Sequence, residues 1–163
     1  MVLLLASIVL SLLALYFVVG MPTVWEWIRP TDQGAVDFAT LERPKAPNTY
    51  LVCPEGVCAA TPDATSPTFA CPADALYGAA IAAMVARGAI EKDRDWADLS
   101  VRFVDHTPIL KFPDTVSIKV YPAGEAASTI TIYSRSLFGS DDFGANAKRV
   151  NALLASLKDC ADG

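Results

Sequence analysis

The densest polar stretch of the chain runs from Tyr133 to Val150, YSRSLFGSDDFGANAKRV, and lies between an alternating segment and a helical one. Its polar side chains could converge above the start of a helix, where free backbone N–H groups favour an anion. An arginine can bind a carboxylate or a phosphate there through two hydrogen bonds, although the neighbouring aspartates partly cancel the positive field. This pattern predicts a ligand-binding or partner-binding site made of Ser134, Arg135, Ser136, Asp141 and Asn146.

The same stretch can also be interpreted as a structural turn. Asp141 or Asp142 suits the N-cap of a helix, where it accepts backbone hydrogen bonds and complements the helix dipole. Arg135 could pair with either aspartate. In this interpretation Lys148 and Arg149 lie on the outer face of the helix. Its apolar stripe consists of Phe143, Val150, Leu153, Leu154 and Leu157.

The four cysteines predict disulfide bonds. They are Cys53, Cys58, Cys71 and Cys160, and an even number in a small exported domain fits an oxidising compartment. We expect a local bond between Cys53 and Cys58 and a second bond that ties Cys71 to Cys160, although four cysteines allow three pairings. A zinc site is disfavoured because the first pair has no second close pair of ligands, and no metal ligands are assigned.

Catalysis has little support in the residue pattern. His106 is the single histidine, and a hydrolase would need it beside Ser134 or Ser136 with Asp114 or Asp141. The chain lacks a Gly-x-Ser-x-Gly elbow and a glycine-rich phosphate loop. No catalytic residue and no cofactor are therefore assigned. The formal net charge of −5 also disfavours non-specific binding to nucleic acid.

The N-terminus predicts a membrane anchor. Residues 2–21 contain no charged side chain, and an apolar run of about 20 residues matches the bilayer core when it is helical. A cleaved signal peptide is the alternative. We expect a transmembrane anchor over residues 1–22, a tether over 23–47 and an α+β domain over 48–160. Within the tether, Val36, Phe38 and Leu41 can pack on the domain.

The orientation of this anchor rests on two opposing signals. Arg29 weakly favours a cytoplasmic domain by the positive-inside rule, whereas the cysteines favour the exported side. We predict a single-pass protein of the bacterial inner membrane with its globular domain in the periplasm.

The sequence of the domain predicts a loop held by its cysteines, a helix, three strands and a second helix. A helical stripe covers residues 72–88, and period-two alternation marks strands at 98–106, 115–121 and 128–134. Alternation implies one buried face per strand. We therefore predict an α+β fold, an N-terminal transmembrane helix followed by a two-layer sandwich, with a three- to four-stranded antiparallel sheet and helices on one face.

Three segments resemble a known family. They are APNTYLVCPEGVC, FPDTVSIKVY and IYSRSLFGSDDFGANAKRVNALLASL. They resemble the domain-of-unknown-function family numbered fourteen ninety-nine, over about residues 46–158, although CPEGVCAA departs from the cysteine loop of many members. The resemblance implies an exported or lumenal domain of bacteria or plastids and supplies no established reaction.

These observations predict a non-enzymatic, membrane-anchored accessory or interaction protein of a membrane or envelope complex. Its partners would be membrane lipid, through residues 2–21, and a protein of that complex. A small-ligand or lipid-binding domain that uses the turn from Ser134 to Asn146 is the alternative. A hydrolase is the third interpretation.

Overall fold

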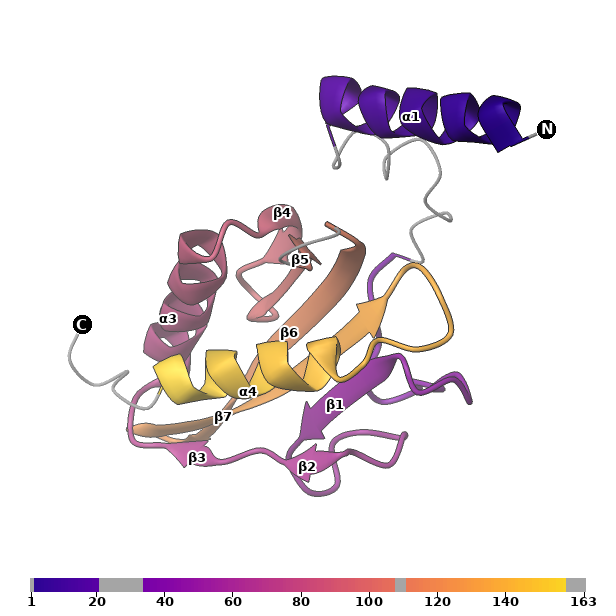
Figure 1. Ribbon diagram of the computed structural model, residues 1–163. Helices are drawn as coiled ribbons and strands as arrows, with labels where there is room; N and C mark the ends of the chain where they lie inside the picture. Colours follow the sequence, from indigo (N-terminus) through magenta and orange to yellow (C-terminus); the bar gives the residue numbers. More distant parts are fainter. Residues whose placement is uncertain (1, 21–33, 108–110, 158–163) are drawn as a thin grey trace.

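The computed structural model describes residues 2–20, 34–107 and 111–157 (Figure 1). Its helices are α1 (Val2–Val19), α3 (Ala73–Ala86) and α4 (Ala145–Ser156). Its strands are β1 (Thr49–Cys53), β2 (Ala64–Thr65), β3 (Thr68–Phe69), β4 (Ile90–Asp95), β5 (Ser100–His106), β6 (Pro113–Gly124) and β7 (Ala127–Ser136).

All of these strands belong to a single mixed sheet of seven strands, in the order β2-β1-β7-β6-β5-β4, with β3 paired to β7. The β1–β2 pair is parallel and the other pairs are antiparallel. The prediction of a three- to four-stranded antiparallel sheet is therefore wrong. It missed β1, β2 and β3 because the proline-rich cysteine segment indicated irregular loops, and it missed β4 because IEKDRD is exposed throughout and shows no alternation.

The transmembrane part of the predicted fold is also corrected. Over the ranges that the structure describes, no helix meets the length and hydropathy needed to cross a membrane. Residues 21–33, which hold the end of the expected anchor and the first part of the expected tether, lie outside the described residues.

Helices α3 and α4 cover one face of the sheet and enclose the main core (Figure 1). Strands β5, β6 and β7 supply this core in the predicted alternation, since Val101, Phe103, Ile118 and Ile132 point toward the helices. Burying such apolar side chains contributes about 1.5–3 kcal/mol each. Helix α3 lies within the predicted range of 72–88, and its alanines allow it to approach the sheet closely.

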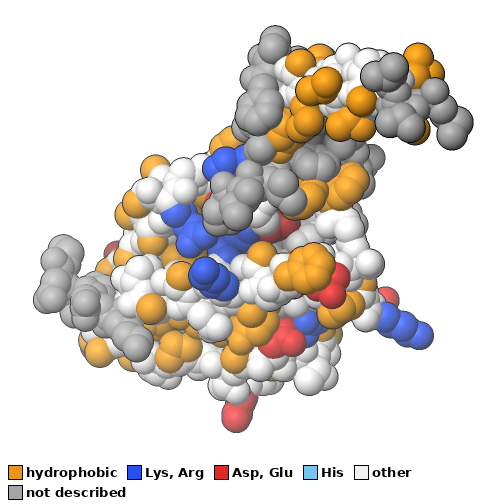
Figure 2. All heavy atoms as spheres, in the orientation of Figure 1, with side chains coloured by type: hydrophobic (Ala, Val, Ile, Leu, Met, Phe, Trp, Pro, Cys, Tyr) orange, Lys and Arg blue, Asp and Glu red, His pale blue; other side chains and the backbone are white. Residues whose placement is uncertain are grey.

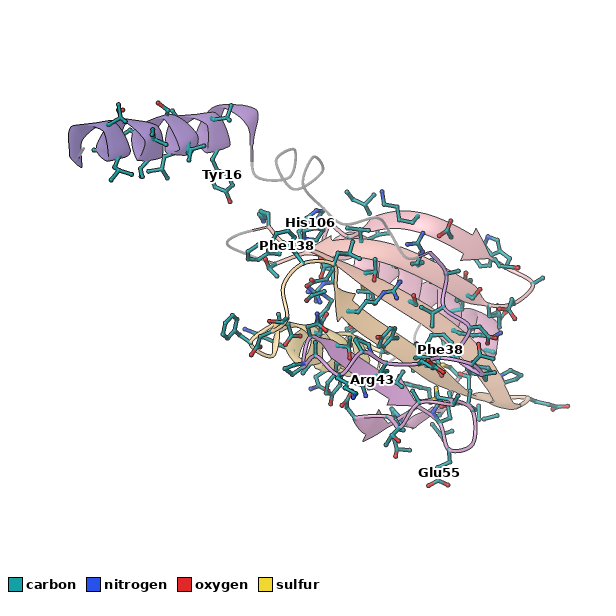
Figure 3. The ribbon with its side chains drawn as sticks, turned by 90° about the vertical axis from the view of Figure 1, so that its right-hand side faces the viewer. Tyr16, Phe38, Arg43, Glu55, His106 and Phe138 are labelled. Carbon is teal, nitrogen blue, oxygen red and sulfur yellow. A yellow bond between two sulfur atoms is a disulfide. The ribbon has the colours of Figure 1, made fainter. Side chains whose placement is uncertain are left out.

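The opposite face of the sheet is partly covered by residues 34–41, which we call the strap (Figure 3). Phe38 of the strap packs with Leu51, Cys53 and Tyr133 in a second, smaller core, flanked by Val36 and Leu41 among others. The prediction that the end of the tether packs on the domain is confirmed. As a result, the sheet carries separate cores on its two faces.

Candidate functional site

A buried polar cluster lies between α4 and the ends of β5, β6 and β7. Arg149 of α4 is its centre and is 4% exposed. Its Nε donates to Asp105 Oδ2 at 2.6 Å and its Nη2 donates to Asp114 Oδ2 at 2.5 Å. We call this cluster the Arg149 network. Its members are Asn48, Asp105, Asp114, Ser134, Ser136, Asn146 and Arg149.

Ser134 and Asn146 belong to this network, and both are completely buried. Ser134 Oγ donates to Asn146 Oδ1 at 2.6 Å, and Arg149 Nη1 donates to the same Oδ1 at 2.7 Å. The side-chain Nδ2 of Asn146 donates to the backbone oxygen of Asn48 at 2.9 Å and to Ser136 Oγ at 3.1 Å. These bonds join α4 to β7 and to Asn48, the residue before β1. The cluster is therefore enclosed between the helix and the end of the sheet.

The hydrogen bonds of the network do not satisfy all of its buried acceptor atoms. Burial raises the pKa of the Asp114 carboxyl, whereas the charge of Arg149 and its hydrogen bond lower that pKa. Asp114 Oδ1 and Asn48 Oδ1 are buried acceptors that lack a hydrogen-bond partner in the described part of the chain. A buried acceptor without a partner costs free energy. The network therefore combines a strong ion pair with two unsatisfied oxygens.

The turn between β7 and α4, residues 137–144, lies next to this network. Asp141 Oδ1 accepts a hydrogen bond from the Phe143 N–H at 2.8 Å. Asp142 accepts from the N–H groups of Gly144 at 2.9 Å and Asn146 at 2.9 Å. Two aspartates therefore fix this turn. The N-cap of α4 is Gly144, so the prediction that Asp141 or Asp142 takes this position is wrong, although Asp142 satisfies donors at the start of the helix.

Phe143 differs from its predicted place in the helical stripe. It lies before α4, has a φ of 50° and is 94% exposed. Hydrophobic and acidic side chains lie together over this turn in Figure 2. The apolar face of α4 begins only at Val150, so the expectation that Phe143 belongs to the core is wrong.

Arg135 lies on the other face of the sheet from Ser134, because adjacent residues of a strand point in opposite directions. Its Nε donates to Thr115 Oγ1 at 3.1 Å, and its Nη2 donates to the backbone oxygen of Gly34 at 3.4 Å. Its guanidinium lies 6.0 Å from the ring centroid of Tyr133. The structure thus brings Ser134, Ser136 and Asn146 together and places Arg135 beside the strap.

The sequence interpretation missed Arg149, Asp105 and Asn48 as members of the site, and it named Asp114 only as a possible triad residue. The prediction that Arg149 lies on the outer face of α4 is wrong, whereas Lys148 is exposed as expected. The spacing contained a usable signal. Asn146, Arg149 and Val150 are three and four residues apart, which places them on one helical face.

The family model described as Protein of unknown function (DUF1499) matches residues 42–157. The chain belongs to this family. The resemblance expected over residues 46–158 is therefore confirmed, and the name DUF1499 supplies no reaction. No curated protein is significantly similar to the chain.

Among solved structures, the di-domain ARO/CYC BexL from the BE-7585A biosynthetic pathway is similar to this DUF1499 chain with a TM-score of 0.44 and 15% identity. The match covers 60% of this chain and 45% of that chain. The DUF1499 chain thus spans less than half of the length of that protein. A likeness of this degree carries no inference about fold or activity.

The hydrolase arrangement does not form in this DUF1499 domain. Ser134 faces the helices and is enclosed by Asn146 and Arg149. His106 follows Asp105 in β5 and therefore points to the opposite face of the sheet. Within the described ranges, Ser134 thus has no histidine on its own face and no solvent access.

The three cysteines of the described ranges form disulfides, as expected. Cys53 is bonded to Cys58, and Cys71 is also disulfide-bonded. Cys160, the predicted partner of Cys71, lies outside the described residues. The part of the chain that the structure describes contains no group of three His, Cys, Asp or Glu side chains that could hold a metal ion.

Proposed function

We propose that this DUF1499 chain is a non-enzymatic interaction module that docks on a protein partner through the turn of residues 137–144. The observation that carries the proposal is Phe143, a large apolar side chain that is 94% exposed on a backbone with a φ of 50°. A left-handed conformation costs a non-glycine residue about 1–2 kcal/mol. Exposure and backbone strain together indicate a residue retained for contact with a partner.

The rest of the turn supports this role. Phe138 is 41% exposed and stacks on Phe112 with a centroid distance of 6.0 Å, which adds apolar surface to the turn. Asp141 and Asp142 lie beside Phe143 and fix its backbone. A partner surface that matches this turn has an apolar pocket with basic side chains at its rim. Aromatic residues held in such pockets often carry a large share of binding energy.

The Arg149 network is hydrogen-bonded to the turn and helps to hold its backbone in place. Apart from the partly exposed Ser136, the side chains of the network are buried, and most of their polar groups are bonded to one another, so they suit positioning better than ligand capture. Asn48 extends the network to the turn, since its Nδ2 donates to the backbone oxygen of Gly139 at 2.8 Å. A fixed turn loses little conformational entropy when a partner binds it.

The cysteines support a proposal for the compartment. We place the domain on the exported side of a bacterial envelope, because disulfides persist in oxidising environments and are rare in the cytosol. The bond between Cys53 and Cys58 and the bonded state of Cys71 support this placement.

The decisive experiment separates contact from folding at Phe143. Asparagine tolerates a positive φ better than phenylalanine, so F143N should leave the free energy of unfolding unchanged or raise it by up to about 1 kcal/mol. The same variant should lose the complex that the wild-type chain forms in its native cells. A photo-crosslinking amino acid at position 143 should trap one discrete partner, measured by mass spectrometry.

Trp96 supplies the matched control, because it is also an exposed aromatic residue, at 59%, and lies outside the turn. A W96A variant should retain the complex, and a crosslinker at position 96 should not trap the same partner. Retention of the complex by F143N, or identical crosslinked products from positions 143 and 96, would refute docking through the turn.

A further inference from the structure

The face of the sheet opposite the Arg149 network contains a groove of about 660 Å³. The strap forms one wall and the hairpin of β4 and β5 forms the other, while β5 and β6 form the floor. We call it the strap groove. Its volume falls within the range of small-molecule sites, about 300–1,000 Å³. Its lining is disjoint from the docking turn, so it provides an independent candidate site.

The floor of the strap groove carries two cations that are more deeply buried than their partners. The Arg102 side chain is 9% exposed, whereas that of Asp93, to which its Nε donates at 2.7 Å, is 58% exposed. The Lys119 side chain is 27% exposed and pairs with Asp98, whose side chain is 51% exposed. The side chains of Arg102 and Lys119 therefore lie deeper in the groove than those of the aspartates with which they pair.

The two cations belong to one polar surface of the sheet. Arg102 is opposite Ser117 and Ser100 is opposite Lys119 in the β5–β6 register. Diagonal positions on neighbouring strands are about 7–8 Å apart, a distance that a small ligand can bridge. Serine hydroxyls beside each cation can donate to the same ligand oxygen atoms.

The strap supplies an apolar wall that is already in place. Val36, Phe38 and Val57 line this side of the groove. Phe38 is 5% exposed, and its backbone oxygen accepts a hydrogen bond from the Ala59 N–H at 3.0 Å. Val57 lies within the loop closed by the bond between Cys53 and Cys58. A ligand would therefore meet this wall without first ordering it, which lowers the cost of binding.

We propose that the strap groove binds a small zwitterion with an apolar side group, of the class of short apolar peptides. A ligand carboxylate can take the place of Asp93 on Arg102, and a ligand ammonium can pair with the more exposed aspartates. A simple anion would meet Asp95 and Asp98, and a simple cation would meet Arg102 and Lys119. The apolar side group would pack against Val36 and Phe38.

The test is isothermal titration of the full-length chain with leucyl-leucine, its N-acetyl derivative and its C-terminal amide. N-acetylation removes the ammonium charge, and amidation removes the carboxylate charge. Each derivative should bind at least about tenfold more weakly than leucyl-leucine, which corresponds to about 1.4 kcal/mol per lost contact. No binding of leucyl-leucine at millimolar concentration, or equal binding of all three, would overturn the proposal.

Variants locate the binding and keep it distinct from protein docking. R102Q and K119Q should each weaken leucyl-leucine binding at least tenfold. K119Q is the safer variant because Lys119 is partly exposed. K148Q on the helix-covered face should bind as the wild type does. F143N should also retain leucyl-leucine binding, so failure of the docking turn and failure of the groove give different results. Equal loss in K148Q and K119Q would argue against the groove.

Discussion

Arg149 joins two buried carboxylates to a helix, and its removal takes the ion pair from Asp114 and leaves Asp105 paired with Arg87 alone. The side chains of Arg149, Asp105 and Asp114 are 4%, 6% and 1% exposed, so solvent cannot replace the lost partner. Removing one member of a buried ion pair typically costs about 3–5 kcal/mol. We expect R149M to lower the free energy of unfolding by that amount, measured by urea denaturation.

Two further variants serve as controls for the R149M prediction. K148M changes the exposed neighbour of Arg149 and should stay within about 0.5 kcal/mol of the wild type. The double variant R149M/D114N also removes the carboxylate charge that R149M leaves unpaired and should recover part of the loss. A stability of R149M equal to that of K148M would show that the Arg149 network does not support the fold.

Asp114 makes stability depend on pH in a definite direction. Its pKa in the folded chain is raised by burial above the value of an unfolded aspartate, which is about 3.9. The folded state therefore binds more protons in the window between these two pKa values. The contribution of Asp114 to stability is full below the unfolded pKa and is lost as the pH rises through the folded pKa.

The D114N variant isolates this effect, because asparagine does not titrate. The free energy of unfolding of the wild type minus that of D114N should decrease as the pH rises from about 4 to about 8. Urea denaturation at several pH values measures this difference while the other carboxyl groups cancel. A difference that increases with pH would mean that Arg149 outweighs burial and lowers the pKa of Asp114.

The sequence identifies most of the residue types of the site, but it does not show to which face of the sheet or helix each side chain points. Ser134, Ser136 and Asn146 lie near one another, because strand alternation and helical spacing bring them to the same end of the sheet. Arg149 was assigned to solvent on the usual behaviour of charged side chains. Its position three residues after Asn146 points inward, and only the partners on β5 and β6 show why a charge is tolerated there.

At the scale of elements, the start of α4 depends on Asp142. Its carboxylate accepts hydrogen bonds from Gly144 and Asn146, and the loss of such a cap costs about 0.5–2 kcal/mol. We expect D142A to lower the free energy of unfolding by that amount. D141A removes only the bond to Phe143 and should cost less. Equal thermal melts of D142A and the wild type would contradict the capping role.

The elements divide clearly into those that the sequence predicts and those that it does not. Strands β5, β6 and β7 alternate because one face contacts the helices, so their pattern predicts them. Strand β4 lies at the sheet edge with all six residues exposed, and its mixed charges suit an edge that should not pair further. Strand β1 lies in a proline-rich segment, and long-range pairing with β7 overrides that local signal.

At the scale of the whole molecule, the two proposed sites lie on different faces of the sheet. The helix-covered face holds the large core and the Arg149 network, which is bonded through Asn48 to the turn proposed for docking. The strap-covered face holds the small core and the groove. Well-separated changes usually add without coupling, so variants of one face should leave the proposed activity of the other face intact.

The bond between Cys53 and Cys58 tests this division, because it belongs to the strap side. Cys53 packs with Phe38 in the small core, and the bond closes the loop that holds Val57. In the chain-entropy account, a loop this short contributes about 2 kcal/mol. We expect the double variant C53A/C58A to lose about that much stability and to release the strap more often than the wild type does.

Hydrogen exchange locates the effect within the molecule. The Ala59 N–H, which donates to Phe38 across the strap, should exchange faster in C53A/C58A. The Leu76 N–H at the start of α3 should change only by the global loss of stability, because it belongs to the other core. The variant should also bind leucyl-leucine more weakly while retaining the complex formed through Phe143. Equal acceleration at Ala59 and Leu76 would mean that the two faces unfold as one unit and that the bond does not act on the strap in particular.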